Sequence, residues 1–85
     1  MSARKEIERI DREMLSLLAS RAALSRAIGK VKRMKGIPIR DRTRERKLEL
    51  MRARRARTLG LDSSFAERLF RSVVADSRRL QETRR

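Results

Sequence analysis

The 85-residue sequence contains no cysteine, no histidine, no tryptophan and no tyrosine. Without cysteine, the chain has neither disulfides nor a catalytic thiolate. Without histidine, it lacks the commonest general base and the commonest metal ligand in proteins. Any chemistry must therefore use carboxylate, lysine, arginine, hydroxyl, amide or backbone groups.

Turn-forming residues and long apolar runs are also scarce. One proline and three glycines disfavour a sheet with many turns, whereas the abundant alanine, leucine, arginine, glutamate and lysine favour helices. The N-terminal MSARKEIERI has no apolar segment of the kind found in signal peptides. No apolar run approaches the length of a membrane span. The sequence therefore predicts an all-α protein, located in the cytoplasm and without a membrane partner.

Positive charge is in excess, with a formal net charge of +14. Such a charge fits a basic helical protein that binds nucleic acid, or an enzyme that acts on an anionic small molecule. The aromatic residues are Phe65 and Phe70 alone, so stacking platforms for single strands are missing. The basic residues are also spread over the whole chain and not gathered into one arm. Both interpretations stay open at this point.

Apolar periodicity and two breaks predict three helices, over about residues 4–34, 42–58 and 64–82. Gly36 and Pro38 separate the first two, because glycine ends a helix readily and proline cannot continue one. We expect one domain over residues 1–85, with no fused second domain.

The predicted helix ends carry capping residues. Asp41 is expected to cap the second helix at its N-terminus, and Gly60 is expected to end it. Ser64 and Glu67 have the spacing of a capping box at the start of the third helix.

The first helix is too long for the rest of the chain to cover. Residues 4–34 would extend about 45 Å, whereas a compact domain of this size has a radius of gyration of about 12 Å. An apolar stripe runs along nearly the whole helix. A homodimer with two-fold symmetry, in which this helix pairs with its copy, is therefore predicted.

Arg21 interrupts that stripe where a large apolar side chain is expected. Lys32 lies about three turns further on and points almost the same way. Ser25 and Ile28 fall between them on the same face. An isolated arginine there could extend its head into solvent, but the pair of cations suits a compact ligand with more than one carboxylate.

The other helices add polar candidates at their predicted inward positions. Arg44 lies on the face of Leu48 and Met51, while Asp41 and Glu45 are placed where the helix dipole favours carboxylates. A simple surface ion pair would also explain Arg44 and Glu45.

Ser77 and Gln81 lie in line with Val73 and Val74 on the third helix, as neutral hydrogen-bonding groups or as the polar end of an apolar face. Arg4 lies about 25 Å from Arg21 along the first helix. Only a partner helix running antiparallel could bring Arg4 to the same site.

Together these features resemble the all-helical class of chorismate mutases. The motifs are R-x-x-I-x-x-I-D, L-L-A-S-R, G-K-V-K, G-I-P-I-R-D-x-x-R-E and L-F-R-S-V-V-A-D-S-x-x-L-Q. They occur over nearly the whole chain, at Arg4 to Asp11, Leu17 to Arg21, Gly29 to Lys32, Gly36 to Glu45 and Leu69 to Gln81.

The resemblance implies an intertwined homodimer of three-helix chains whose long first helices pack antiparallel. It also implies the Claisen rearrangement of chorismate to prephenate, at the branch point to phenylalanine and tyrosine. That reaction is intramolecular and pericyclic, so no metal and no cofactor is expected.

The resemblance assigns roles to the charged residues. Arg21 and the partner subunit's Arg4 would hold the two carboxylates of the substrate. Lys32 would donate a hydrogen bond to the ether oxygen, together with Gln81. Glu45 would bind the ring hydroxyl with backbone near Asp41. The remaining lining would be polar at Arg44 and Ser77 and apolar at Ile28 and Val74.

Two other reactions on the same fold remain alternatives. One is the isochorismate pyruvate-lyase reaction, and the other is the rearrangement of 4-amino-4-deoxychorismate. Glu45 and Ser77 together favour the mutase over the lyase, since the lyase-like pattern does not keep both. The non-enzymatic alternative is still a basic helical protein that binds nucleic acid, which would have no use for Glu45 or Gln81.

Overall fold

The computed structural model describes residues 2–82, and this part of the chain forms three helices and no strand. The helices are α1 (Ala3–Lys35), α2 (Arg42–Thr58) and α3 (Ser63–Glu82). Each bound agrees with the predicted one to within a residue, and the all-α class is confirmed. None of these helices has the length and apolar character that crossing a membrane requires.

The ends of α1 and the start of α2 follow the local sequence. Ser2 caps α1 by accepting a hydrogen bond from the Lys5 amide at 3.2 Å. Gly36 ends α1 in the left-handed conformation, with φ of 66°, which an L side chain would disfavour. Asp41 caps α2 by accepting from the Arg44 amide at 3.0 Å, as predicted.

The turn between α2 and α3 confirms one prediction and corrects another. Gly60 has φ of 74° and directly follows Leu59, the C-cap residue of α2, so it ends the helix as predicted. The capping box predicted for Ser64 is wrong. The Asp62 carboxylate accepts from the amides of Ser64 at 3.4 Å and Phe65 at 3.3 Å. An ionised carboxylate at a helix N-terminus also gains from the helix dipole, which a serine hydroxyl does not.

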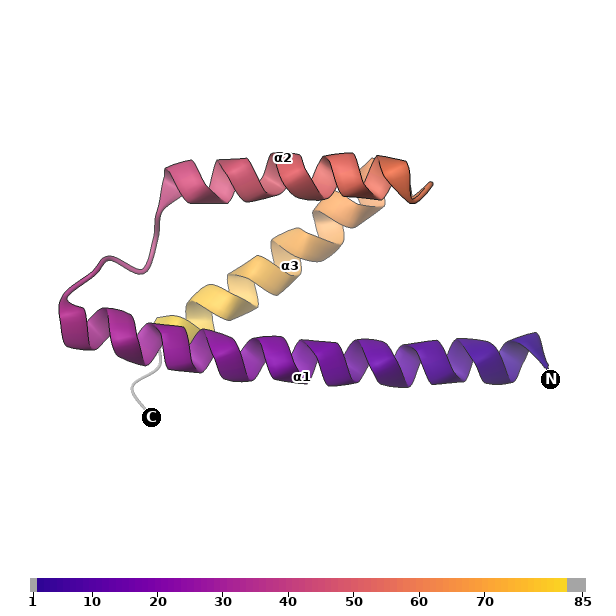
Figure 1. Ribbon diagram of the computed structural model, residues 1–85, viewed down its shortest axis with the longest axis horizontal. Coiled ribbons are helices and arrows are strands. Elements are labelled where there is room, and N and C mark those ends of the chain that lie inside the picture. Colours follow the sequence, from indigo (N-terminus) through magenta and orange to yellow (C-terminus); the bar gives the residue numbers. More distant parts are fainter. Residues whose placement is uncertain (1, 83–85) are drawn as a thin grey trace.

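The three helices are arranged around α3, which crosses diagonally between the other two (Figure 1). α3 packs against α1 and against α2, whereas α1 and α2 do not pack against each other. The described chain measures 51 × 27 × 15 Å, and α1 occupies its longest dimension. Side chains that point from α1 and α2 towards α3 can therefore meet over one face of α3.

The core of the single chain is thin. Among residues 2–82, the buried apolar side chains are Ala56, Ala66 and Leu80. Large apolar side chains of α1 remain exposed, with 59% of Ile7 and 69% of Leu17 accessible to solvent. The radius of gyration of 15.5 Å exceeds the value of about 12 Å for a compact domain of this length.

The N-terminal part of α1 extends past α2 and α3 (Figure 1). The exposed stripe of apolar side chains on α1 comprises Ile7, Ile10, Met14, Leu17, Leu24, Ile28 and Val31. Burying such side chains would contribute about 1.5–3 kcal/mol each. Most of this free energy of burial is not gained in a single chain, because these side chains of α1 stay exposed.

Candidate active site

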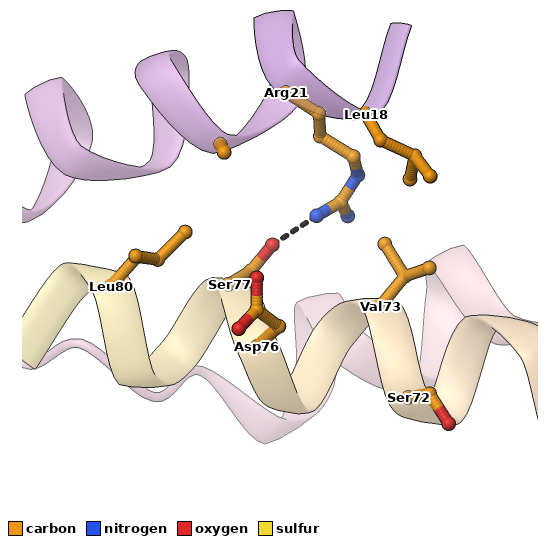
Figure 2. A pocket seen from close by; sticks show the side chains of 8 residues that line it. Leu18, Arg21, Ser72, Val73, Asp76, Ser77 and Leu80 are labelled. Carbon is orange, nitrogen blue, oxygen red and sulfur yellow. Dashed lines mark hydrogen bonds between the residues drawn. The ribbon is translucent and has the colours of Figure 1, made fainter. Parts of the chain in front are cut away.

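Arg21 points from α1 towards α3 (Figure 2), and its guanidinium donates a hydrogen bond to the Ser77 hydroxyl oxygen. The Ser25 hydroxyl donates to the same oxygen at 3.1 Å. Ser25 and Ser77 are buried, and Arg21 is half-buried. Arg21 is therefore directed between the helices and does not extend outward into solvent.

A pocket of about 260 Å³ lies beside Arg21 between α1 and α3. Figure 2 shows Leu18 and Val73 to one side of the guanidinium and Leu80 to the other. Arg21 and Ser77 provide polar groups within this largely apolar lining, and the remaining lining residues are Ala22, Ser72 and Asp76. An apolar pocket with a few convergent polar groups is typical of a small-molecule site.

Lys32 and Gln81 form a second polar pair, about three turns along α1 from Arg21. The Lys32 ammonium donates to the Ile39 carbonyl at 3.0 Å and to Gln81 Oε1 at 3.4 Å. An ammonium carries three N–H donors and a glutamine amide carries two. One donor of Lys32 and the amide N–H groups of Gln81 are therefore left for a ligand.

Gly29 and Arg33 determine where Gln81 lies. Gly29 is buried, and a Cβ atom added there would lie 2.5 Å from the Cα of Gln81 and 2.8 Å from its carbonyl carbon. Only glycine lets the last turn of α3 come this close to α1. The Arg33 guanidinium then donates to the carbonyl of Gln81. The sequence showed a glycine inside a long helix, which costs about 1 kcal/mol relative to alanine and was a usable signal for such an approach.

Glu45 is half-buried between two arginines. Its carboxylate lies 3.4 Å from Nε of Arg40 and 3.6 Å from Nε of Arg78. The Arg78 Nε is buried and makes no hydrogen bond. Glu45 therefore connects the start of α2 to α3. Its ion-pair partners are Arg40 and Arg78, and not Arg44 as in the surface pair considered from the sequence.

Several predicted site residues lie away from these contacts in the single chain. Arg44 is exposed and Met51 is 57% exposed, so the expected inward position of Arg44 is not seen here. Asp41 is exposed, Ile28 is 46% exposed and Val74 is half-buried. The predicted residues brought into contact are Arg21 with Ser77, and Lys32 with Gln81.

Arg4 is exposed in the first turns of α1. It lies about 25 Å from Arg21 along the helix. No bend in α1 brings the two residues together, since α1 continues unbroken from Ala3 to Lys35.

Arg52 is a cation that the sequence analysis did not single out. Its side chain is half-buried, with the guanidinium 4.8 Å from the ring centre of Phe70 on α3. Burial lowers the pKa of Arg52, and the positive charge of Arg21 lowers it further, against the raising effect of Glu49. The spacing of Leu48, Arg52 and the buried Ala56 was a usable signal, because residues four apart share a helix face.

Comparison with known proteins decides the family. The sequence profile described as "Chorismate mutase type II" matches residues 3–82. The chain belongs to the chorismate mutase type II family. The match includes both polar pairs described above. Within residues 2–82 of this family member, no cluster of three or more carboxylates is placed to hold a metal ion.

Relatives of this chorismate mutase type II chain are found in bacteria and archaea. It is 37% identical over 81 residues to a bifunctional chorismate mutase/prephenate dehydratase of Escherichia coli K12, covering 91% of this chain and 20% of that protein. It is 28% identical over 79 residues to a chorismate mutase of Methanocaldococcus jannaschii, covering 93% of this chain and 80% of that protein. The chain thus spans about a fifth of the length of the bifunctional relative.

A solved structure shares the fold of this family member. It is a conserved hypothetical protein from Pyrococcus furiosus, with a TM-score of 0.70 and 34% sequence identity. The superposition covers 93% of this chain and 90% of that one. The three-helix arrangement in Figure 1 therefore also occurs in a protein solved independently.

Proposed function

We propose that this protein is a chorismate mutase that rearranges chorismate to prephenate. The observation that carries the proposal is the contact between Lys32 and Gln81, which leaves N–H donors of both residues available to a ligand. In the rearrangement, the ether oxygen gains negative charge as its bond to carbon breaks. Donors fixed at that oxygen bind the transition state more strongly than the substrate, which accelerates the reaction.

The substrate's two carboxylates would be held by Arg21 and by the partner subunit's Arg4. Clamping both groups selects the folded conformer in which the reacting carbons are close, and this can supply several kcal/mol of the barrier reduction. The Arg21 guanidinium is already oriented by Ser77. Little side-chain freedom then remains to be lost when a carboxylate binds.

The remaining contacts follow from the family pattern. Glu45, with backbone near Asp41, would bind the ring hydroxyl. Its carboxylate is positioned by ion pairs with Arg40 and Arg78. Arg44 and Ser77 would complete the polar lining, and Ile28 and Val74 would form apolar walls.

The rearrangement needs no proton transfer, redox step or exchange with solvent. The residues above bind, orient and stabilise charge, and none of them has to act as a nucleophile. The chain therefore has no need of histidine or cysteine for this chemistry. Activity is expected to persist in a chelator.

The proposal includes a homodimer in which the α1 helices pack antiparallel. Two observations support it: the apolar stripe of α1 is uncovered in a single chain, and Arg4 cannot reach Arg21 of its own α1. An antiparallel partner would cover the stripe with its copy and bring a second arginine to each pocket. The relative that carries prephenate dehydratase activity in its name supports a place in phenylalanine biosynthesis.

The test is an assay of the purified chain with chorismate, with and without a chelator, and with isochorismate in parallel. Prephenate is the expected product of chorismate, at the same rate in both buffers. Consumption of chorismate without prephenate would refute the proposal. Release of pyruvate from isochorismate would identify the lyase instead, and preferred turnover of the 4-amino analogue would identify the third reaction.

The shared site is tested by mixing two inactive variants, Arg4→Ala and Arg21→Ala. A mixed dimer should contain one site with both arginines and one site with neither. About half the activity per mixed dimer is therefore expected to return. Mixed dimers that form, as shown by mass spectrometry, but stay inactive would exclude a site built from two chains.

A further inference from the structure

Arg52 approaches the candidate site from the side opposite to Arg21. Phe70, which lies under the Arg52 guanidinium, shares one face of α3 with Val74 and Ser77, because the spacings of four and three follow the helical repeat. Phe70 and Ser77 are about two turns, or 10 Å, apart along α3. Arg52 on α2 and Arg21 on α1 therefore contact the same face of α3 on either side of Val74, the expected apolar wall.

Neither Arg21 nor Arg52 forms an ion pair with a carboxylate within residues 2–82, the described part of the chain. Asp76, which lines the pocket beside Arg21, is paired with Arg79. Burial lowers the pKa of Arg52, and the like charge of Arg21 lowers it further, against the raising effect of Glu49 from a distance. Half-buried like charges on facing helices gain most from an anion that binds between them.

We infer that Arg52 is a substrate-binding residue, which contacts from α2 the same carboxylate that Arg21 holds from α1. This inference rests on the proposed function, since it takes a dicarboxylate as the ligand. The carboxylate carries its charge before and after the rearrangement. Arg52 therefore stabilises the bound substrate and the transition state equally, which lowers KM and leaves kcat unchanged.

The test compares Arg52→Gln with Arg54→Gln. Arg54 is exposed on α2, and it is rotated by about 200° from Arg52, away from α3. Both variants lose one positive charge from the same helix, so the attraction of an anion to the net charge falls equally. Arg52→Gln should raise the KM for chorismate about tenfold or more, as expected for loss of a charged hydrogen bond. Its kcat should stay within about twofold of the wild type, as expected for uniform binding.

A purely structural role of the stacked arginine predicts a different pattern. Loss of the Phe70 contact alone would lower the melting temperature and leave the KM of Arg52→Gln equal to that of Arg54→Gln. Relief of repulsion from Arg21 should instead keep the melting temperature of the free protein at or above the wild-type value. A KM effect without loss of thermal stability supports the inference, and equal KM values for the two variants overturn it.

Calorimetric binding of prephenate separates failure of the inference from failure of the proposed function. If the wild-type chain turns over chorismate but Arg52→Gln and Arg54→Gln bind prephenate equally well, the role of Arg52 is refuted and the proposed function stands. Wild-type chain that neither turns over chorismate nor binds prephenate would refute both. Weaker prephenate binding in Arg52→Gln than in Arg54→Gln is the expected result.

Discussion

Replacing Gly29 by alanine tests how closely α3 must approach α1 for catalysis. The added Cβ atom would lie 2.5 Å from the Cα of Gln81, whereas ordinary contacts are 3.4–4 Å. Alanine has no alternative rotamer that would move its Cβ away. The added Cβ is bonded directly to the backbone, and the Cα of Gln81 is a backbone atom, so neither can move alone. The last turn of α3 must therefore move by about 1 Å, which is the difference between these distances.

The shift would lengthen the hydrogen bond between Lys32 and Gln81, which is already near the upper limit of length. Gln81 Oε1 already lies 3.4 Å from the Lys32 ammonium, and a further 1 Å would break the contact. Misplacement by about 1 Å can cost roughly 100-fold in rate. Overpacking costs about 1–3 kcal/mol of stability, partly offset by the gain of about 1 kcal/mol from replacing glycine within a helix. We expect kcat to fall about 100-fold, with a loss of stability of at most about 2 kcal/mol.

Gly60→Ala is the matched control for that experiment. It adds the same methyl group where no atom lies within 4 Å, at φ of 74°, and costs about 1–2 kcal/mol of backbone strain. Both variants would be compared by chorismate turnover and by urea unfolding. Gly60→Ala should lose stability but keep its kcat. A kcat of Gly29→Ala within about threefold of the wild type, at saturating substrate, would refute the argument that Gly29 positions Gln81.

The other predictions concern single contacts and the association of chains. Lys32→Ala should lower kcat about 100- to 1,000-fold in steady-state kinetics, as for loss of one oxyanion donor. Asp41→Ala removes the N-cap of α2 and should cost about 1 kcal/mol in urea unfolding, whereas an unchanged midpoint would argue against that cap. Ser77→Ala removes the hydrogen-bond partner of the buried Ser25 hydroxyl and of the half-buried Arg21 guanidinium, and should cost about 1–3 kcal/mol. The melting temperature should fall on dilution, because chain association stabilises the fold, and a constant value would contradict the dimer.

The sequence was sufficient for the helices because their determinants are local. The periodicity of apolar residues located the first and third helices, and the breaks at Gly36 and Gly60 bounded the second. Gly36 and Asp41 marked ends that depend on a single residue's backbone or side chain. The error at Ser64 arose because two capping residues compete within one turn. The spacing of Ser64 and Glu67 fits a capping box, but the carboxylate of Asp62 forms the observed cap.

The contacts between helices were predicted only in part. Arg21 and Lys32 stood out because cations interrupt an apolar stripe on one helix. Arg52 did not, because α2 is crowded with arginine, and only the position of Phe70 on another helix shows which arginine is half-buried. The role of Gly29 likewise depends on where the end of α3 lies. Both features arise from packing between segments that are distant in the sequence.

The position of Arg4 at the far end of α1 has a thermodynamic consequence. When each pocket takes one arginine from either chain, substrate binding and chain association are linked equilibria. Any factor by which association tightens substrate binding must reappear as the same factor in the affinity of one chain for the other. Chorismate would then hold the two chains together at concentrations where the empty enzyme dissociates.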